Sequence, residues 1–189
     1  MNTTFLVSDH HFSHKNLLTF KRDDGTPLRP FTTVEEMDSY MIEKHNSVVG
    51  KDDKVYFVGD VCFHVRDLDR IMPQLNGRKI LIKGNHDQLK VSQYQRYFKD
   101  IRAYDRLDTC ILGHIPIHPD SLGGKTSLQI HGHTHYRNVT MIDAGGNKVI
   151  DKRYFNVSVE NINYTPISFD QILKINNLNS VELETDSFD

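Results

Sequence analysis

The sequence predicts an α/β domain, and three observations support this prediction. Short apolar runs typical of buried strands recur at residues 5–7, 54–58, 79–82, 109–112, 127–130 and 155–159. Helical patterns separate several of these runs, and two of the patterns open with a capping box. The length of 189 residues fits one domain, which we place at 1–180, followed by an acidic tail at 181–189. Strands that alternate with helices are typical of an α/β fold.

The first strand, Phe5–Val7, runs directly into Ser8-Asp9-His10-His11. Alternate side chains of an extended chain point to the same face. We therefore expect Asp9 and His11 to point together and His10 to point away.

Residues 12–30 follow without clear periodicity and contain one glycine and two prolines, so we expect a long loop over the end of the first strand. Some polar side chains of this loop are candidates for substrate contacts, with a solvated loop position as the alternative. They are His14, Asn16, Arg22 and Arg29.

Thr33, followed three residues later by Glu36, has the form of a capping box and predicts a helix that ends near Gly50. We expect His45 of this helix at the surface. A second helix is expected to be irregular near Pro73, because a proline disfavours helical geometry in the residue before it. This second helix lies within 62–75. Further helical segments are expected within 88–99 and after the second capping box at 168–171.

The second and third strands both end in a glycine followed by polar residues. Strand 54–58 ends in Gly59-Asp60, and a buried carboxylate there needs a charge partner, for which a metal ion or an arginine would serve. Strand 79–82 leads into Gly84-Asn85-His86-Asp87, where the glycine permits a sharp turn. Such side chains lie at the carboxyl end of a sheet, where open α/β sheets bind ligands.

Histidines dominate the next two strand ends. Strand 109–112 ends in Gly113-His114, and strand 127–130 leads into His131-Gly132-His133-Thr134-His135. On extended backbone His133 and His135 share a face. Beyond them, residues 139–154 are expected to form a hairpin or loop.

The strand ends supply oxygen and nitrogen donors and no thiolate, a set that suits Mn²⁺, Fe²⁺ or Zn²⁺. A single tetrahedral zinc ion would use four ligands, whereas two ions that share a bridging carboxylate would use the whole set. The candidate metal ligands are Asp9, His11, Asp60, Asn85, His114, His133 and His135.

Composition and charge indicate which partners and which location to expect for the protein. The formal net charge of −2 gives no general electrostatic case for nucleic acid or for an anionic membrane. Cys62 and Cys110 lie in apolar runs and are expected to be buried, reduced thiols. With no signal peptide at the N-terminus and no apolar run of membrane-spanning length, we expect a cytoplasmic location and no membrane partner.

In order and spacing, these motifs resemble those of the calcineurin-like metallophosphoesterases, in the small single-domain form found in bacteria and phages. The family order is Asp-x-His, Gly-Asp, Gly-Asn-His-Asp/Glu, a lone His, and Gly-His-x-His. The corresponding stretches here are 9–11, 59–60, 84–87, 114 and 132–135.

The resemblance implies a site with two divalent metal ions, with Mn²⁺ as the first candidate and Fe²⁺, Zn²⁺ or Ni²⁺ as alternatives. It assigns Asp9, His11 and His135 to one ion, and Asn85, His114 and His133 to the other. Asp60 would bridge the ions. His86 would be the catalytic residue that stabilises the phosphoryl oxygens or protonates the leaving oxygen, and Asp87 would orient either His86 or its loop.

The resemblance also implies a four-layer β-sandwich of two mixed sheets flanked by helices. The implied activity is that of a metal-dependent phosphoesterase, a hydrolase that cleaves a phosphodiester by attack of metal-bound hydroxide. The alternatives are a phosphomonoesterase and a non-catalytic metal-binding scaffold on the same fold.

A small phosphate ester is the expected partner, with a nucleotide as the leading candidate. The aromatic residues near the motifs are candidates either for stacking on a base or for packing in the core. They are Phe12, Phe20, Phe31 and Tyr136. The sequence makes no prediction about the oligomeric state.

Overall fold

The computed structural model describes residues 2–178, so the expected acidic tail lies outside the described residues. The larger of its two main sheets has the strand order β11-β1-β2-β3-β4. These strands are β1 Thr4–Val7, β2 Lys54–Phe57, β3 Arg78–Ile82, β4 Asp100–Arg102 and β11 Ile167–Ser168. Strands β1 to β4 are parallel, and β11 is antiparallel to β1.

The register of this sheet explains why the motifs meet. Val7 pairs with Phe57, and Phe57 pairs with Leu81, so the carboxyl ends of β1, β2 and β3 are level. The residues that follow each strand therefore leave the sheet at one edge.

The second sheet has the order β10-β7-β6-β5 and is also mixed. Its strands are β5 Tyr104–Leu107, β6 Cys110–Gly113, β7 Leu128–His131 and β10 Tyr154–Asn156. Strands β6, β7 and β10 are parallel, whereas β5 is antiparallel to β6. A single parallel bridge, Ser8 to Ser158, joins the two sheets just beyond the ends of β1 and β10.

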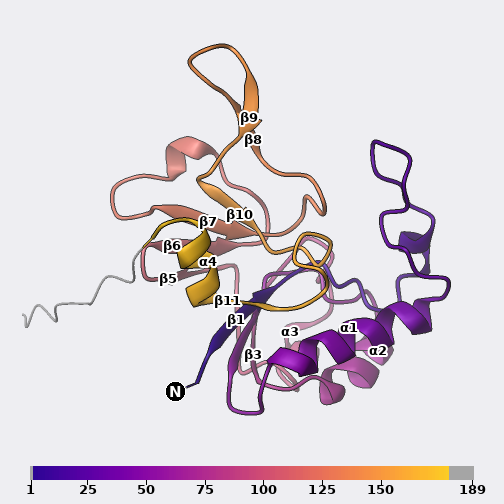
Figure 1. The fold of residues 1–189 in the computed structure, drawn as a ribbon. Helices are drawn as coiled ribbons and strands as arrows, with labels where there is room; N and C mark the ends of the chain where they lie inside the picture. The colour runs from indigo at the N-terminus through magenta and orange to yellow at the C-terminus, as the bar shows by residue number, and fades with distance from the viewer. Residues whose placement is uncertain (1, 179–189) are drawn as a thin grey trace, which may run out of the picture.

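Side chains of both sheets form one apolar core, so the sheets pack face to face. Leu6 and Val58 come to this core from the side of the larger sheet, and Leu112 and Ile130 come from the smaller sheet. A second core lies on the other face of the larger sheet, against helices α1 Val34–Val48 and α2 Val65–Ile71 (Figure 1). The fold is thus mixed α/β with helices, sheet and sheet as three layers.

The expected fourth layer is not among the described elements. Helix α4, Phe169–Ile175, places Ile172 and Leu173 in the core between the sheets and contacts β1 and β11. It closes an edge of the sandwich and does not cover the outer face of the smaller sheet. Between β6 and β7 the structure has loops and the short 3₁₀ turn Pro119–Ser121.

Both helix starts are capped at the expected places, but only the one at α4 forms a full capping box, because the Glu36 side chain at α1 accepts from Thr32 N and not from Thr33 N. The Thr33 side chain accepts a hydrogen bond from Glu36 N, and Ser168 and Gln171 cap each other reciprocally at α4. As Pro73 predicts, α2 passes into a 3₁₀ turn, Met72–Gln74. The expected helix over 88–99 is reduced to α3, Val91–Tyr94, with turns on either side.

The expectation of a surface position for His45 is wrong. Its side chain is 1% exposed, stacks on Phe57 and contacts the carbonyl oxygen of Asn76 through Nε2. It therefore packs in the core. Both cysteines are buried and free, as expected.

The expected hairpin forms as β8 Thr140–Ile142 and β9 Lys148–Ile150, and it projects from the body of the protein (Figure 1). Among residues 2–178, none of the helices has the length and apolar character needed to cross a membrane.

Candidate metal centre

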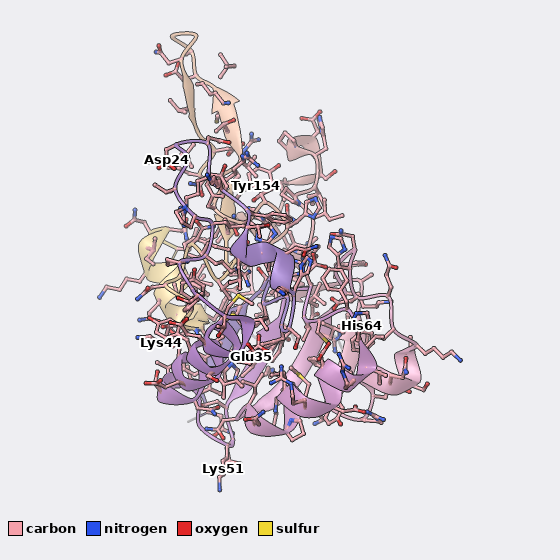
Figure 2. All side chains as sticks on the ribbon, turned by 90° about the vertical axis from the view of Figure 1, so that its right-hand side faces the viewer. Asp24, Glu35, Lys44, Lys51, His64 and Tyr154 are labelled. Carbon is pink, nitrogen blue, oxygen red and sulfur yellow. The ribbon has the colours of Figure 1, made fainter. Side chains whose placement is uncertain are left out.

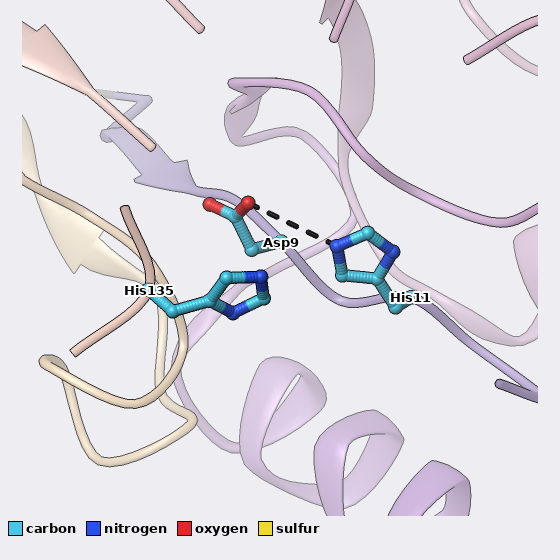
Figure 3. Close-up of side chains that lie close together, drawn as sticks. All are labelled: Asp9, His11 and His135. Atoms are coloured by element: carbon cyan, nitrogen blue, oxygen red, sulfur yellow. Dashed lines mark ion pairs between the residues drawn. The ribbon is translucent and has the colours of Figure 1, made fainter. Parts of the chain in front are cut away.

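The strand ends place six of the seven candidate ligands in two compact groups. Asp9, His11 and His135 form one group, and Asp60, His114 and His133 form the other. Within each group the potential ligand atoms lie within 4.8 Å of one another. Figure 3 shows the first group, in which Asp9 and His11 from the segment after β1 converge with His135 from the segment after β7.

Asp60 connects the two groups. Its Oδ2 lies 3.5 Å from Nε2 of His11 and 3.2 Å from Nε2 of His114. The seventh candidate, Asn85, joins the second group, since its Oδ1 lies 3.0 Å from Nε2 of His114 and 2.9 Å from Nδ1 of His133. The two groups thus suggest a dinuclear site, in which ions typically lie ~3.5–4 Å apart.

Hydrogen-bonding chemistry indicates that the second group fits a cation. The Nδ1–H of His114 donates to the carbonyl oxygen of Val58 at 2.8 Å, so a neutral ring has only a lone pair at Nε2. That lone pair faces the oxygens of Asp60 and Asn85, which are also acceptors. Such an arrangement is favourable when a proton or a metal ion lies between the atoms.

Without a metal ion, protons have to stabilise the same contacts. Burial favours a neutral His114, but hydrogen bonding and charge from Asp60, together with the charge of Asp9, raise the pKa of His114 to about 9. Although burial opposes it, His114 and His11 hold the pKa of Asp60 below its ordinary value. Burial lowers the pKa of His11 to about 2, so this ring stays neutral, the form that binds metal.

The backbone of the candidate ligands differs from the extended geometry that we expected. Asp9, His11, His133 and His135 have φ values of 58°, 48°, 68° and 50°, and Asp60 has 58°. These values lie in the left-handed region, where a residue with a Cβ is disfavoured by roughly 1–2 kcal/mol. The paired side chains therefore share a direction because of this strained backbone, a feature that concentrates at functional sites.

Two glycines of the motifs are required because carboxylates pack directly on them. A Cβ on Gly84 would overlap the side chain of Asp60, and one on Gly132 would overlap the side chains of Asp9 and Ser8. Side chains larger than hydrogen at these positions would displace the carboxylates of both groups.

Hydroxyl groups hold the Asp9 carboxylate in place. Ser8 donates to Oδ2 at 2.6 Å, and Ser158 donates to the same atom at 2.9 Å. The other oxygen, Oδ1, lies 4.0 Å from Nε2 of His11, as the dashed line in Figure 3 marks. Oδ1 is therefore the oxygen that faces the ligand group.

A buried carboxylate, Glu160, orients His135. Its Oε1 lies 3.0 Å from Nδ1 of His135, and because a carboxylate only accepts, Nδ1 carries the hydrogen. This fixes the tautomer that leaves Nε2 free to bind a metal ion, as in the carboxylate–histidine pairs of zinc sites. Although burial opposes it, Arg29 and His135 hold the pKa of Glu160 at about 2.

Arg29 is the counterion of Glu160, which corrects its expected role as a phosphate contact. The guanidinium lies 2.8 Å from Oε1 of Glu160, and it also donates to the backbone carbonyls of Asp9 and His10. With 1% of its surface exposed, Arg29 has no face available to a substrate. It supports the chain that carries the first ligands.

His86 lies exposed at the rim of the site. Its ring centroid is 5.5 Å from that of His11 and 5.1 Å from that of Phe63, and its backbone N–H donates to Asp60 Oδ1 at 2.9 Å. The buried Asp87 accepts hydrogen bonds from the backbone of Gly84, Asp60 and Val61. Of the two roles left open for Asp87, the structure shows the orientation of the loops.

The remaining candidates differ in their positions. His14 is half-buried beside the site, with its ring centroid 5.8 Å from that of His11. Asn16 is exposed in the 3₁₀ turn Lys15–Leu18. Arg22 lies over the ring of Tyr136, 5.2 Å from its centroid. Contacts of these three residues with a substrate stay predictions.

Two residues of the site, Glu160 and Ser158, were not predicted from the sequence. A signal was present, because the chain beyond the predicted strand 155–159 continues directly into Glu160, a polar ending like those of the other strands. Its partner, Arg29, gave no such signal.

The chain resembles two curated proteins. It is 32% identical over 182 residues to the uncharacterized protein MJ1445 of Methanocaldococcus jannaschii, a match that covers 93% of this chain and 92% of the relative. The chain belongs to the same family as MJ1445. The Gene 66 protein of Mycobacterium phage L5 is 30% identical over 172 residues and is covered to 78% of its length, with 71% of this chain matched. No family model matches the sequence.

Among solved structures, a protein of unknown function from Aquifex aeolicus, AQ665, has the same fold. It aligns with a TM-score of 0.66 and 24% identity, over 93% of this chain and 100% of that protein. A Vps29 single mutant from Entamoeba histolytica aligns over 81% of this chain and 72% of that one at a TM-score of 0.39 and 15% identity, too low to support a conclusion.

Proposed function

We propose that this protein is a dinuclear metal-dependent phosphoesterase that hydrolyses a phosphodiester. The observation that supports the proposal most directly is the position of Asp60 between the two ligand groups, within 3.5 Å of His11 and 3.2 Å of His114. Two divalent ions at such a site lower the pKa of bound water and so supply a nucleophile at neutral pH.

Charge supports an anionic substrate. Two divalent ions carry +4, and Asp9 and Asp60 contribute −2, while Asn85 and the histidines bind as neutral groups. The site therefore keeps an excess of positive charge, which attracts the oxygens of a phosphate ester. Mn²⁺ is the first candidate for both positions, with Fe²⁺, Zn²⁺ and Ni²⁺ as alternatives.

His86 is suited to act on the substrate because its ring is exposed and belongs to neither ligand group. Packing against Phe63 and His11 restricts the ring to the rim of the site. From there it would donate a hydrogen bond to a phosphoryl oxygen or a proton to the leaving oxygen. A general acid of this kind contributes typically 10²–10⁴-fold to the rate.

The test is hydrolysis of bis(p-nitrophenyl) phosphate and p-nitrophenyl phosphate by the metal-supplemented protein. We expect cleavage of the diester, and His86→Ala should lower turnover by about 10²–10⁴-fold while the metal content stays unchanged. His118→Ala, at an exposed histidine on the turn after β6, is the matched control and should behave as wild type.

Each alternative has its own outcome. Cleavage of the monoester alone would favour a phosphomonoesterase. Metal binding without turnover of either ester would favour a non-catalytic scaffold. A protein that neither contains nor acquires divalent metal on titration would refute the metal centre itself.

A further inference from the structure

A groove of about 790 Å³ opens beside the candidate metal centre, and none of the functions described above uses it. Its lining includes the ligands His133 and His135, and on the other side residues of a loop at 19–28, among them Phe20 and Lys21. The volume is that of a ligand site, which typically measures ~300–1,000 Å³. A molecule bound in the groove would therefore reach the metal ligands.

The loop at 19–28 is held in a defined conformation. Leu28 N donates to Phe20 O at 2.8 Å, and Arg22 N donates to Thr26 O at 2.8 Å, so the loop folds back on itself. In Figure 2 its residue Asp24 lies in the upper part of the view, far from Lys51 at the bottom, which precedes β2. The loop thus stands at the carboxyl end of the parallel strands, where the ligand groups lie.

Contacts with the segment that carries the histidines fix the loop in place. Arg137 forms an ion pair with Asp23 at 2.6 Å, and the hydroxyl of Tyr136 accepts a hydrogen bond from Asp23 N at 3.1 Å. The groove is therefore bordered by two segments that are already joined, and such preorganisation lowers the entropic cost of binding.

Positive charge lies at the groove, because Lys21 and Arg137 line it and Arg22 lies over the ring of Tyr136, which also lines it. The guanidiniums of Arg22 and Arg137 lie 5.2 Å and 4.9 Å from the centroid of the Tyr136 ring. Asp23 neutralises Arg137, whereas neither Arg22 nor Lys21 has a described carboxylate oxygen within 4.0 Å. A second anionic group of a ligand would find these two cations available.

The structure also distinguishes among the four aromatic candidates for stacking. Phe12 is buried, Phe31 packs against the core, and Tyr136 has two guanidiniums over its ring. Phe20 is 48% exposed and lines the groove. It is the aromatic side chain that is open to a flat ligand.

We propose that this groove binds the base and sugar of a nucleotide, with Phe20 stacking on the base and Arg22 and Lys21 facing an additional anionic group. The proposal rests on the proposed function, because the ester phosphorus would lie at the metal centre. Phe20 and Arg22 are then determinants of specificity and act on no reacting atom.

The test measures binding of adenosine monophosphate and of ribose phosphate, which lacks the base, to the metal-loaded protein by calorimetry. Stacking is worth roughly 1–3 kcal/mol per base, so Phe20→Ala should lower the ratio of the two affinities by about 5- to 150-fold. Arg22→Gln should weaken the binding of adenosine diphosphate more than the binding of adenosine monophosphate. Tyr104→Ala, at an aromatic residue that is 67% exposed on β5, is the control and should leave the ratio unchanged.

The outcomes separate this inference from the proposed function. Equal ratios in wild type and Phe20→Ala, or no preference of wild type for the nucleotide over ribose phosphate, would overturn the groove proposal even if the protein hydrolyses diesters. Binding that depends on Phe20 in a protein without esterase activity would support the groove and refute the phosphoesterase.

Discussion

Replacing Glu160 by glutamine tests how the protein supports its candidate metal ligands. Glu160 is buried and accepts from both Arg29 and His135. Glutamine keeps the size and one carbonyl oxygen but removes the charge. The guanidinium of Arg29 would then lie buried without a counterion, and Nδ1 of His135 would lose the carboxylate that fixes its tautomer.

Glu160→Gln should lower both the free energy of unfolding and the affinity for metal. Removing one partner of a buried ion pair costs about 3–5 kcal/mol of the free energy of unfolding. Removing the hydrogen-bond partner of a metal-ligating histidine typically lowers metal affinity by about 10- to 100-fold. The first loss follows from the unpaired charge of Arg29 and the second from His135. Arg29→Met removes that charge together with the hydrogen bonds to the carbonyls of Asp9 and His10, so it should restore stability only in part.

The free energy of unfolding is measured by urea denaturation, and Mn²⁺ affinity by calorimetry. In the double variant Arg29→Met with Glu160→Gln, stability should recover in part because no unpaired charge remains buried, whereas Mn²⁺ affinity should stay low. Glu43→Gln, the same chemical change at an exposed position of α1, is the control. Unchanged Mn²⁺ affinity in folded Glu160→Gln would refute the positioning role.

Three further predictions concern other parts of the chain. Gly132→Ala should weaken Mn²⁺ binding by at least about 10-fold, because the new Cβ displaces Asp9; equal affinity by calorimetry would contradict the packing. Burial lowers the pKa of His45 to about 4, so as the pH falls from about 6.5 towards 4 the unfolded chain takes up a proton that the folded protein does not. Stability should fall by up to about 1.4 kcal/mol per pH unit in that window, and urea denaturation of His45→Gln should show a smaller slope than wild type. Thr33→Ala removes the cap of α1 and should cost about 1 kcal/mol, measured in the same way, and an unchanged midpoint would argue against the cap.

Much of the fold followed from local signals. Apolar runs and capping boxes predicted most strands and the starts of α1 and α4, because a buried strand and a capped helix are specified by neighbouring residues. The helix expected at 88–99 has an apolar pattern, but only Val91–Tyr94 is helical. The expected outer helical layer came from the resemblance, and no residue pattern supported it.

The clustering of the ligands was predictable because level parallel strands deliver their next residues to one edge. The backbone conformation of these candidate ligands was not predictable from the sequence. Asp9 and His11 point together through left-handed backbone, which a short polar motif does not distinguish from an extended strand. The positions of Arg29 and His45 were also hidden, since a charged or polar residue is buried only when distant partners, here Glu160 and Asn76, satisfy it.

The ligand groups draw on chain segments from Asp9 to His135, and both sheets contribute. The unfolded chain therefore has no preformed site, and the affinity for metal is part of the free energy of folding. Ions that bind only the folded state add RT ln(1 + [L]/Kd), about 2.7 kcal/mol at one hundred times Kd. The melting temperature of this protein should therefore rise with the concentration of its native metal, so that a thermal scan across divalent ions would rank them without any knowledge of the substrate.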